Sequence, residues 1–310
     1  MRIGFLGLGL MGTPMTVNLA RRFRHVSAWN RTAARTEALA AAGAPGVRRC
    51  GTPREVLERS DTVFMMLLDG GAARSVVGDA GFRAGLRGKT IVNAASVSVE
   101  CSLRLAEEVR RAGGRFVEMP VSGGKVPAER GELVGMLAAE EESVAEEVKG
   151  SGCLEPLVKT AVYCGPIGSA LKTKYAVNAF LVTLTAGLAE SLNLARAQGI
   201  DLAAVGEVLD AGPLASAFTR IKVGKVVRGD WSAHGAISVC CDSSRHICEA
   251  ARREGLRSPL LEAAAGLFRE ADERGLGGED MMALYKMLRE QQQERREEMQ
   301  PLAGQPLVSV

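Results

Sequence analysis

The sequence is poor in aromatic residues and lacks long runs that are apolar or of one charge. Aromatic residues make up 4% and hydrophobic residues 46% of the 310, which is typical of a soluble globular protein with an aliphatic core. The net charge is +3 and charges of both signs are intermixed, so there is no clustered basic face for nucleic acid. No apolar run approaches the about eighteen residues of a membrane span. We therefore expect neither a nucleic-acid nor a membrane partner.

The cysteines lack the spacings that metal sites use. There are seven, an odd number, with no C-x-x-C pair and no Cys/His cluster at zinc-ligand spacing. Free thiols are typical of proteins in reducing compartments. We predict reduced cysteines, no metal and a cytoplasmic location.

The amino terminus carries a glycine motif in the context that dinucleotide binding requires. Ile3–Leu6 predicts a buried strand, Gly7, Gly9 and Gly12 follow at G-x-G-x-x-G spacing, and Met15–Leu19 predicts a helix. The three glycines would allow, in turn, a tight turn, the approach of a pyrophosphate, and close helix–strand packing. A glycine-rich turn without a ligand is the alternative. The context favours a nicotinamide dinucleotide at the helix N-terminus.

The segment after the second predicted strand, Val26–Trp29, lacks an acidic residue. An NAD site usually has Asp or Glu there, to accept a hydrogen bond from the ribose 2′-hydroxyl. This chain has Asn30, Arg31 and Thr32, with Arg35 one helical turn further on. Arginine suits a 2′-phosphate through charge-assisted hydrogen bonds. We therefore predict NADP(H) in preference to NAD(H), with a solvated basic loop as the alternative.

Strand and helix patterns alternate as far as about residue 165. The predicted strands are Arg2–Leu6, Val26–Trp29, Thr62–Leu67, Thr90–Asn93, Phe116–Glu118, Leu133–Ala138 and Ala161–Cys164. This alternation predicts an α/β fold with a mostly parallel sheet and helices on both faces. Ligands then bind at the carboxyl ends of the strands.

The remainder is predicted to be all-α. Ala170–Gln198 predicts one long helix that joins two lobes, and the shorter helices are Leu202–Asp210, Ser238–Arg253, Pro259–Arg274 and Asp280–Glu297. We therefore predict an NADP-binding Rossmann domain over 1–165, an all-α substrate and dimerisation domain over 166–294, and a disordered tail over 295–310.

Two further segments carry groups suited to carbonyl chemistry. Lys174 and Asn178 are four residues apart in the predicted long helix, so they lie on one face. A partly buried lysine can act as an acid and base. In Pro120–Gly124, small residues leave backbone N–H groups free to form an anion nest beside the Ser122 hydroxyl. Taken singly, each segment also fits a plainer interpretation, a solvated helix face and a tight turn.

Together these segments resemble the β-hydroxyacid dehydrogenase family, which includes 3-hydroxyisobutyrate and 6-phosphogluconate dehydrogenases. Four segments match in order: Gly4–Gly12, Val92–Ser98, Pro120–Gly124 and Gly168–Asn178. Trp29–Thr32 and Ser122–Leu133 are most similar to the glyoxylate/succinic semialdehyde reductase subgroup. The resemblance implies a Rossmann domain followed by an all-α domain, assembly into homodimers or homotetramers, and no metal.

The resemblance also implies a role for each matching residue. Lys174 would be the catalytic acid/base and Asn178 its partner, with Ser122 acting both in catalysis and in binding. Substrate binding would involve Ser122, Gly123, Gly124, Ser96, Asn178 and His234. Cofactor binding would involve Gly7, Leu8, Gly9, Leu10, Met11, Gly12, Asn30, Arg31, Thr32, Arg35, Leu68, Asp69, Ser96 and Asp242.

The chain departs from the family pattern at two places. The family often has a Lys-Asp pair that closes over cofactor and substrate, preceded by an aromatic or apolar residue at the position of His234. Here the pair is Cys241 and Asp242, and a thiol supplies neither the charge nor the reach of lysine. Ala95 likewise replaces a usual serine. These changes indicate an altered substrate, weaker hold on the cofactor, or both.

The favoured hypothesis is an NADPH-dependent reductase of a small, carboxylated aldehyde or keto acid, reversible as a 3-hydroxyacid dehydrogenase. An imine reductase of the same fold is the first alternative, although those enzymes usually lack this lysine. A non-catalytic NADP-binding scaffold protein is the second.

Overall fold

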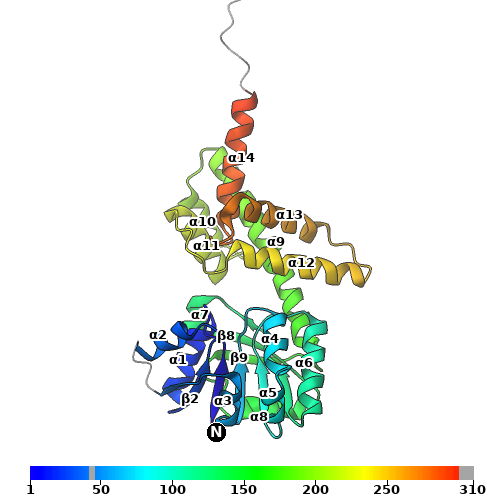
Figure 1. Ribbon diagram of the computed structural model, residues 1–310. Coiled ribbons are helices and arrows are strands. Elements are labelled where there is room, and N and C mark those ends of the chain that lie inside the picture. The colour runs from blue at the N-terminus through cyan, green and yellow to red at the C-terminus, as the bar shows by residue number, and fades with distance from the viewer. Residues whose placement is uncertain (42–45, 300–310) are drawn as a thin grey trace, which may run out of the picture. The chain divides into compact units, whose positions relative to one another are not determined.

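The computed structural model describes residues 1–41 and 46–299, which fall into two compact units. The first unit is Met1–Ala176 and the second begins at Val177 (Figure 1). Helix α9 (Ser169–Ala197) crosses this boundary, because its first turns bury Ala170 and Leu171 against the first unit. The unit boundary therefore lies later in the chain than the predicted domain boundary after residue 165.

A nine-stranded sheet lies at the centre of the first unit, as the structure describes it. Its order is β3-β2-β1-β4-β5-β6-β8-β7, with β9 paired to β8. The strands are β1 (Ile3–Leu6), β2 (Val26–Trp29), β3 (Val47–Arg49), β4 (Thr62–Met65), β5 (Thr90–Asn93), β6 (Arg115–Glu118), β7 (Val121–Ser122), β8 (Leu133–Ala139) and β9 (Val158–Tyr163). The first six strands in this order, from β3 through β2, β1, β4 and β5 to β6, are parallel to one another. Strand β8 is antiparallel to β6. This is the doubly wound order of a dinucleotide-binding domain, as predicted.

Helices cover both faces of this sheet. Strand β1 has apolar side chains on both sides, as a parallel sheet between two layers of helices requires. Phe5 packs with Met15 and Leu19 in one core cluster, and Leu6 packs with Leu57 in another. One face is covered by α1 (Gly12–Arg22), α2 (Ala33–Ala41), α7 (Lys125–Arg130) and α8 (Glu142–Gly150); the other is covered by α3 (Pro53–Glu58), α4 (Gly70–Val77), α5 (Ala80–Ala84) and α6 (Val99–Arg111).

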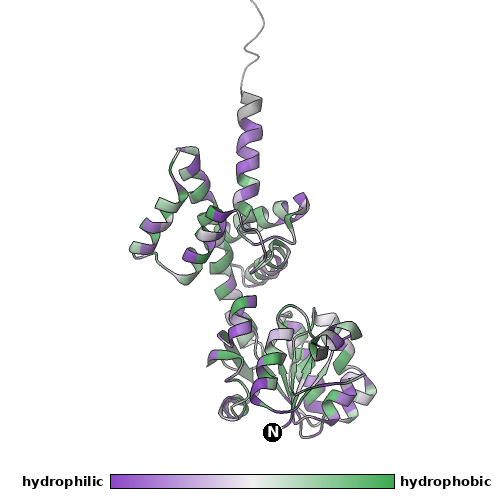
Figure 2. Cartoon of the chain, turned by 90° about the vertical axis from the view of Figure 1, so that its left-hand side faces the viewer, coloured by the Kyte–Doolittle hydropathy of each residue, from purple (hydrophilic) through white to green (hydrophobic). Residues whose placement is uncertain are grey.

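Within the described residues, the regular elements of the second unit are all helices, as predicted, and one isolated β-bridge joins Ala236 to Asp280. After α9 its helices are α10 (Leu202–Ala211), α11 (Ala217–Arg228), α12 (Ile237–Arg253), α13 (Pro259–Ala271), the π-helical turn η1 (Asp272–Leu276) and α14 (Ala283–Met299). A buried ion pair lies inside it, with Lys222 Nζ 2.8 Å from Asp280 Oδ1. Figure 2 shows the strands of the first unit mainly green and the middle turns of α14 mainly purple, so this stretch of α14 is polar.

Several elements differ from the sequence-based expectation. Strands β3 and β7 and helix α11 were not predicted, and the helix predicted to reach Arg274 ends at Ala271. A left-handed Gly275 (φ +85°) in η1 breaks the α-helical pattern there. The predicted tail, 295–310, includes the last residues of α14, and from residue 300 it lies outside the described residues.

The expectation about membrane-length segments was wrong for α9. By length and composition alone this helix is long and apolar enough to cross a membrane, although core helices of soluble proteins pass the same test. One third of its most apolar window is buried within the protein. The absence of a membrane partner stays a prediction.

Candidate active site

The glycine loop between β1 and α1 has a shape that only glycine permits. Gly7 has φ +101°, and a side chain there would clash with the carbonyl of Met66, while one at Gly12 would clash with the carbonyl of Gly7. At Gly9 the nearest atom to an added Cβ would be Arg35 Nη1, 3.7 Å away, so this side of the loop is open. The loop therefore offers bare backbone at the start of α1, which fits the pyrophosphate of a dinucleotide.

Asn30 holds this loop in place from the end of β2. Its Oδ1 accepts a hydrogen bond from the Leu8 N–H at 2.9 Å, and its Nδ2 donates to the Thr32 carbonyl at 3.0 Å. Arg35 donates from Nη1 to the Leu8 carbonyl at 3.4 Å. Both ends of the Asn30 amide are thus engaged by the protein, and Asn30 shapes the loop on which the cofactor would lie.

The cationic residues expected at the 2′-position are close to this loop. Arg31, Thr32 and Arg35 are exposed at and beyond the end of β2. Arg35 also lines a cleft of about 740 Å³, together with Leu8, Gly9 and Leu10. Among the described residues, neither Arg31 nor Arg35 forms an ion pair with an acidic side chain. Their positive charges are therefore available to an anionic group.

The other predicted cofactor residues follow β4 and β5. Leu68 is 83% exposed, and the Asp69 carboxylate accepts the Ala72 N–H at 2.8 Å as the N-cap of α4. Ser96 is exposed after β5, whereas Ala95 is buried. Asp69 therefore has a local structural role, and Leu68 and Ser96 present their side chains to solvent at the carboxyl edge of the sheet.

The loop Pro120–Gly124 lies directly beside Lys174. Strand β7 pairs Ser122 with Val134 of β8, and Gly123 follows with φ +127°. Lys174 Nζ donates a hydrogen bond to the carbonyl oxygen of Val121, across 2.9 Å. The structure thus brings Lys174 to the residue that precedes Ser122. Ser122 and Lys174 are both half-buried, so solvent reaches them only in part.

Glu118, which was not predicted from the sequence, also belongs to this group. It ends β6, is fully buried, and its Oε1 accepts the Gly168 N–H at 2.8 Å. Burial raises the pKa of this carboxyl, while Ser102 and the N–H groups that begin α9 lower it. The sequence held one signal for this role, an acidic residue at the end of an apolar strand. An acidic side chain is seldom buried without partners.

Asn178 lies four residues after Lys174 on α9, so the two side chains share one helix face. Within the second unit, Asn178 Nδ2 donates to Ser243 Oγ at 3.0 Å. Its Oδ1 is buried and has no hydrogen-bond partner among the described residues. Ser243 was not anticipated, and it fixes the rotation of the Asn178 amide.

His234 lies at the buried ion pair of the second unit. Its backbone N–H donates to Asp280 Oδ2 at 2.9 Å, and its ring is half-buried. Partial burial lowers the pKa of the imidazole, and the charges of Lys225 and Lys222 lower it further. His234 is therefore mainly neutral near pH 7.

Cys241 and Asp242 occupy the first turns of α12. Partial burial raises the pKa of the Cys241 thiol, and the carboxylates of Asp272 and Asp242 raise it further. Asp242 is exposed and forms an ion pair with Arg245, at 3.5 Å. The thiol thus stays protonated and neutral near pH 7, so no positive charge comes from position 241.

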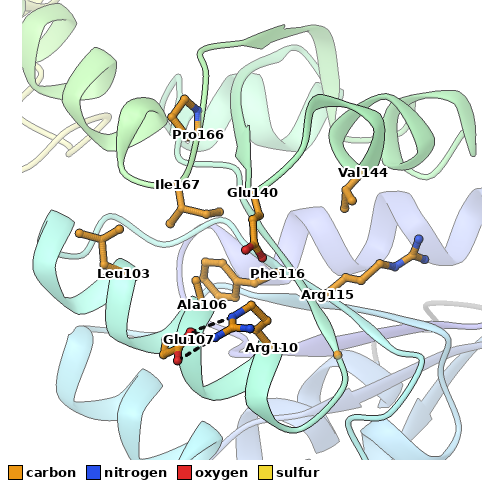
Figure 3. Close-up of a pocket in the computed structure, with 11 residues that line it drawn as sticks. Leu103, Ala106, Glu107, Arg110, Arg115, Phe116, Glu140, Val144, Pro166 and Ile167 are labelled. Carbon is orange, nitrogen blue, oxygen red and sulfur yellow. Dashed lines mark hydrogen bonds and ion pairs between the residues drawn. The ribbon is translucent and has the colours of Figure 1, made fainter.

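A second cavity in the first unit contains none of the predicted site residues. It has a volume of about 320 Å³ and lies between α6 and the β9–α9 connection, with Leu103, Phe116 and Ile167 in its lining. Figure 3 shows Glu107 and Arg110 paired with each other at its rim. Because these charges neutralise each other, they give the cavity no net attraction for a charged ligand.

Comparisons with known proteins agree with this architecture. Residues 2–164 match the NAD-binding domain of 6-phosphogluconate dehydrogenase, and residues 168–288 match the NAD-binding domain of NADP-dependent 3-hydroxyisobutyrate dehydrogenase. Glyoxylate/succinic semialdehyde reductase 1 of Arabidopsis thaliana is 31% identical over 93% of this chain and 99% of its own. Human cytokine-like nuclear factor N-PAC is 32% identical over 92% of this chain, and the aligned region covers 51% of N-PAC. A crystal structure of 3-hydroxyisobutyrate dehydrogenase from Salmonella typhimurium superimposes with a TM-score of 0.81, at 21% identity, over 93% of this chain and 99% of its own.

The doubly wound sheet, the glycine loop and the all-α second unit define a dinucleotide-dependent oxidoreductase. The matches over most of the chain then give the family. The chain belongs to the NAD(P)-dependent β-hydroxyacid dehydrogenases, with the glyoxylate/succinic semialdehyde reductases among its relatives.

Proposed function

We propose that this chain is an NADPH-dependent reductase of small aldehydes or keto acids that carry a carboxylate. The observation that supports this most strongly is the hydrogen bond from Lys174 Nζ to the Val121 carbonyl. It places an ammonium group beside the Ser122 loop, where a substrate carbonyl and its carboxylate would both find donors.

Each residue of this group then has a distinct task. Ser122 and the backbone N–H groups of Gly123 and Gly124 bind the substrate carboxylate. When bound, the reduced cofactor supplies a hydride to the carbonyl carbon. Lys174 donates a proton to the carbonyl oxygen as it gains charge, and Asn178 orients the same oxygen. In the reverse direction Lys174 accepts the proton of a 3-hydroxyacid.

The preference for NADP(H) rests on charge at the end of β2. Arg31 and Arg35 are exposed there, no acidic residue follows the strand, and Thr32 adds a hydroxyl donor. A 2′-phosphate would form charge-assisted hydrogen bonds with these groups, whereas NAD(H) would leave them with water alone.

The test is NADPH oxidation, followed by nicotinamide absorbance, against a panel of acceptors. The panel holds glyoxylate, succinic semialdehyde, aldehydes without a carboxylate and cyclic imines, with NADH run beside NADPH. Turnover confined to carboxylated carbonyl compounds supports the proposal. Turnover of imines alone identifies an imine reductase, and no turnover at all favours the non-catalytic scaffold.

Self-association belongs to this proposal. Val177, Phe180 and Leu194 of α9 are 42%, 69% and 61% exposed, so this helix presents several large apolar side chains to solvent. We propose that a second copy of the chain covers this apolar surface of α9 in a homodimer or homotetramer in the cytoplasm.

A further inference from the structure

Glu118 is a fully buried acidic residue whose carboxyl accepts a hydrogen bond at the start of α9. Its exposed fraction is 0%, at the end of β6. An ionised carboxylate taken out of water is strongly unfavourable unless hydrogen bonds or charges compensate. Oε1 accepts the Gly168 N–H at 2.8 Å. Burial raises the pKa of this carboxyl, and Ser102 together with the Gly168, Leu171 and Ala170 N–H groups opposes that rise.

These N–H groups are the ones that a helix leaves unsatisfied at its first turn. Helix α9 has 29 residues, and its N-terminus carries a partial positive charge that favours an anion. Gly168, with φ +96°, turns the chain into the helix there. Glu118 is 50 residues away in the sequence, yet it does the work of an N-cap side chain.

The same two segments meet again about 1.7 turns further along the helix. Val121, three residues after Glu118, accepts the hydrogen bond from Lys174 Nζ. Lys174 lies six residues after Gly168, a rise of about 9 Å along the helix axis. The segment 118–122, which includes Ser122, therefore holds the start of α9 at two points.

We infer that Glu118 is a positioning residue for Lys174. By binding the N-terminus of α9, its carboxylate fixes the axial position of the helix, and this sets where the Lys174 ammonium lies relative to Ser122. The inference rests on the proposed role of Lys174 as the acid. Ser102 of α6 also lowers the pKa of this carboxyl, so α6 and the N–H groups at the start of α9 share in holding it.

Glu118→Gln is the direct test because it keeps the size of the side chain. The amide loses the charge that favours the helix N-terminus, and its NH₂ group opposes N–H groups of α9. We expect kcat to fall by about 10- to 100-fold, since small misplacements of a catalytic group have effects of that size. The KM for NADPH should change by less than about twofold, because the cofactor loop is untouched.

A second readout separates positioning from simple stabilisation. With NADPH deuterated at the transferred position, the kinetic isotope effect on kcat should rise in Glu118→Gln, since a misplaced acid makes the chemical step more rate-limiting. Asp61→Asn is the matched control: it removes a carboxylate bound to Arg2 at the opposite edge of the sheet. It should lower stability while leaving kcat and the isotope effect unchanged.

Lys174→Ala, measured alongside, separates the acid role of Lys174 from the positioning role of Glu118. If its turnover equals that of the parent, the proposed function fails whatever Glu118 does. If Lys174→Ala is inactive while Glu118→Gln keeps the parental kcat and isotope effect, the positioning role is wrong. Should Glu118→Gln not fold, Glu118→Asp decides. It keeps the charge but withdraws from Gly168 by one methylene, so a parental kcat there also overturns the inference.

Discussion

Lys174 Nζ and the Val121 carbonyl oxygen are 2.9 Å apart, and this contact joins helix α9 to the loop that contains Ser122. A backbone carbonyl accepts from the ammonium and carries no full negative charge of its own. It also restrains a side chain that otherwise has many rotamers. The contact thus gives the proposed acid a defined position before substrate binds.

Lys174→Ala should lower kcat by about 10²- to 10⁴-fold, the usual range for loss of a general acid. The affinity for NADPH should change little, because the glycine loop and Arg31 stay in place. Steady-state kinetics and cofactor titration by fluorescence measure the two effects. Lys172→Ala, on the same helix with an exposed side chain, is the control and should match the parent. Parental turnover in Lys174→Ala would remove this residue as the acid.

Arg31→Asp should weaken NADPH far more than NADH. Loss of a charge-assisted hydrogen bond together with new repulsion should raise the Kd for NADPH by at least about 10-fold. Arg87→Asp is the control, since it makes the same charge change on an exposed residue before the amino end of β5. Calorimetric titration with both cofactors gives the comparison. An equal loss for NADH and NADPH in Arg31→Asp would contradict the NADP preference.

The features that could be predicted from the sequence are local. The strand β1, the glycines after it and the long helix α9 each follow from a short pattern of apolar residues, because neighbouring residues determine these structures. Strands β3 and β7 have three and two residues, too few to show any periodicity, so they were not predicted.

The contacts that organise the site depend on distant residues, and sequence patterns do not encode them. Asn30 binds the Leu8 N–H across 22 residues, Glu118 binds the start of α9 across 50, and Asn178 binds Ser243 across 65. Of these, Asn30 and Asn178 were expected to face the cofactor or the substrate. The structure shows that their amides are also engaged by the protein.

Cys241→Lys should strengthen binding if position 241 lies where the family has its lysine. The surroundings favour a positive charge, since the carboxylates of Asp272 and Asp242 already raise the pKa of the thiol. We expect a lower KM for NADPH or for an acidic substrate, by several-fold. Cys241→Ser, which removes the thiol without adding a charge, should leave both KM values near the parental ones. If lysine and serine behave alike, the correspondence with the family position is wrong.

Acid should weaken the first unit through Asp61. The Arg2 guanidinium holds the pKa of this carboxyl at about 2, below its ordinary 3.8. Because the folded-state pKa is the lower one, the ion pair contributes stability above about pH 4 and loses it as the pH falls towards 2. Both side chains are largely exposed, so the contribution is at most about 1 kcal/mol. Asp61→Asn should lower the midpoint of urea unfolding clearly at pH 7 and much less at pH 2. An equal shift at both values would rule out the charge as the cause.

Phe180→Glu should separate the subunits. Phe180 is 69% exposed on α9, and burying a carboxylate in an apolar contact between two copies would cost several kcal/mol. The mass in solution, measured by sedimentation equilibrium, should fall from that of a dimer or tetramer towards that of one chain. Leu256→Glu is the control, since Leu256 is 62% exposed but belongs to the segment after α12 and not to α9. If the parent is already a monomer, or if Phe180→Glu keeps the parental mass, α9 does not hold the subunits together.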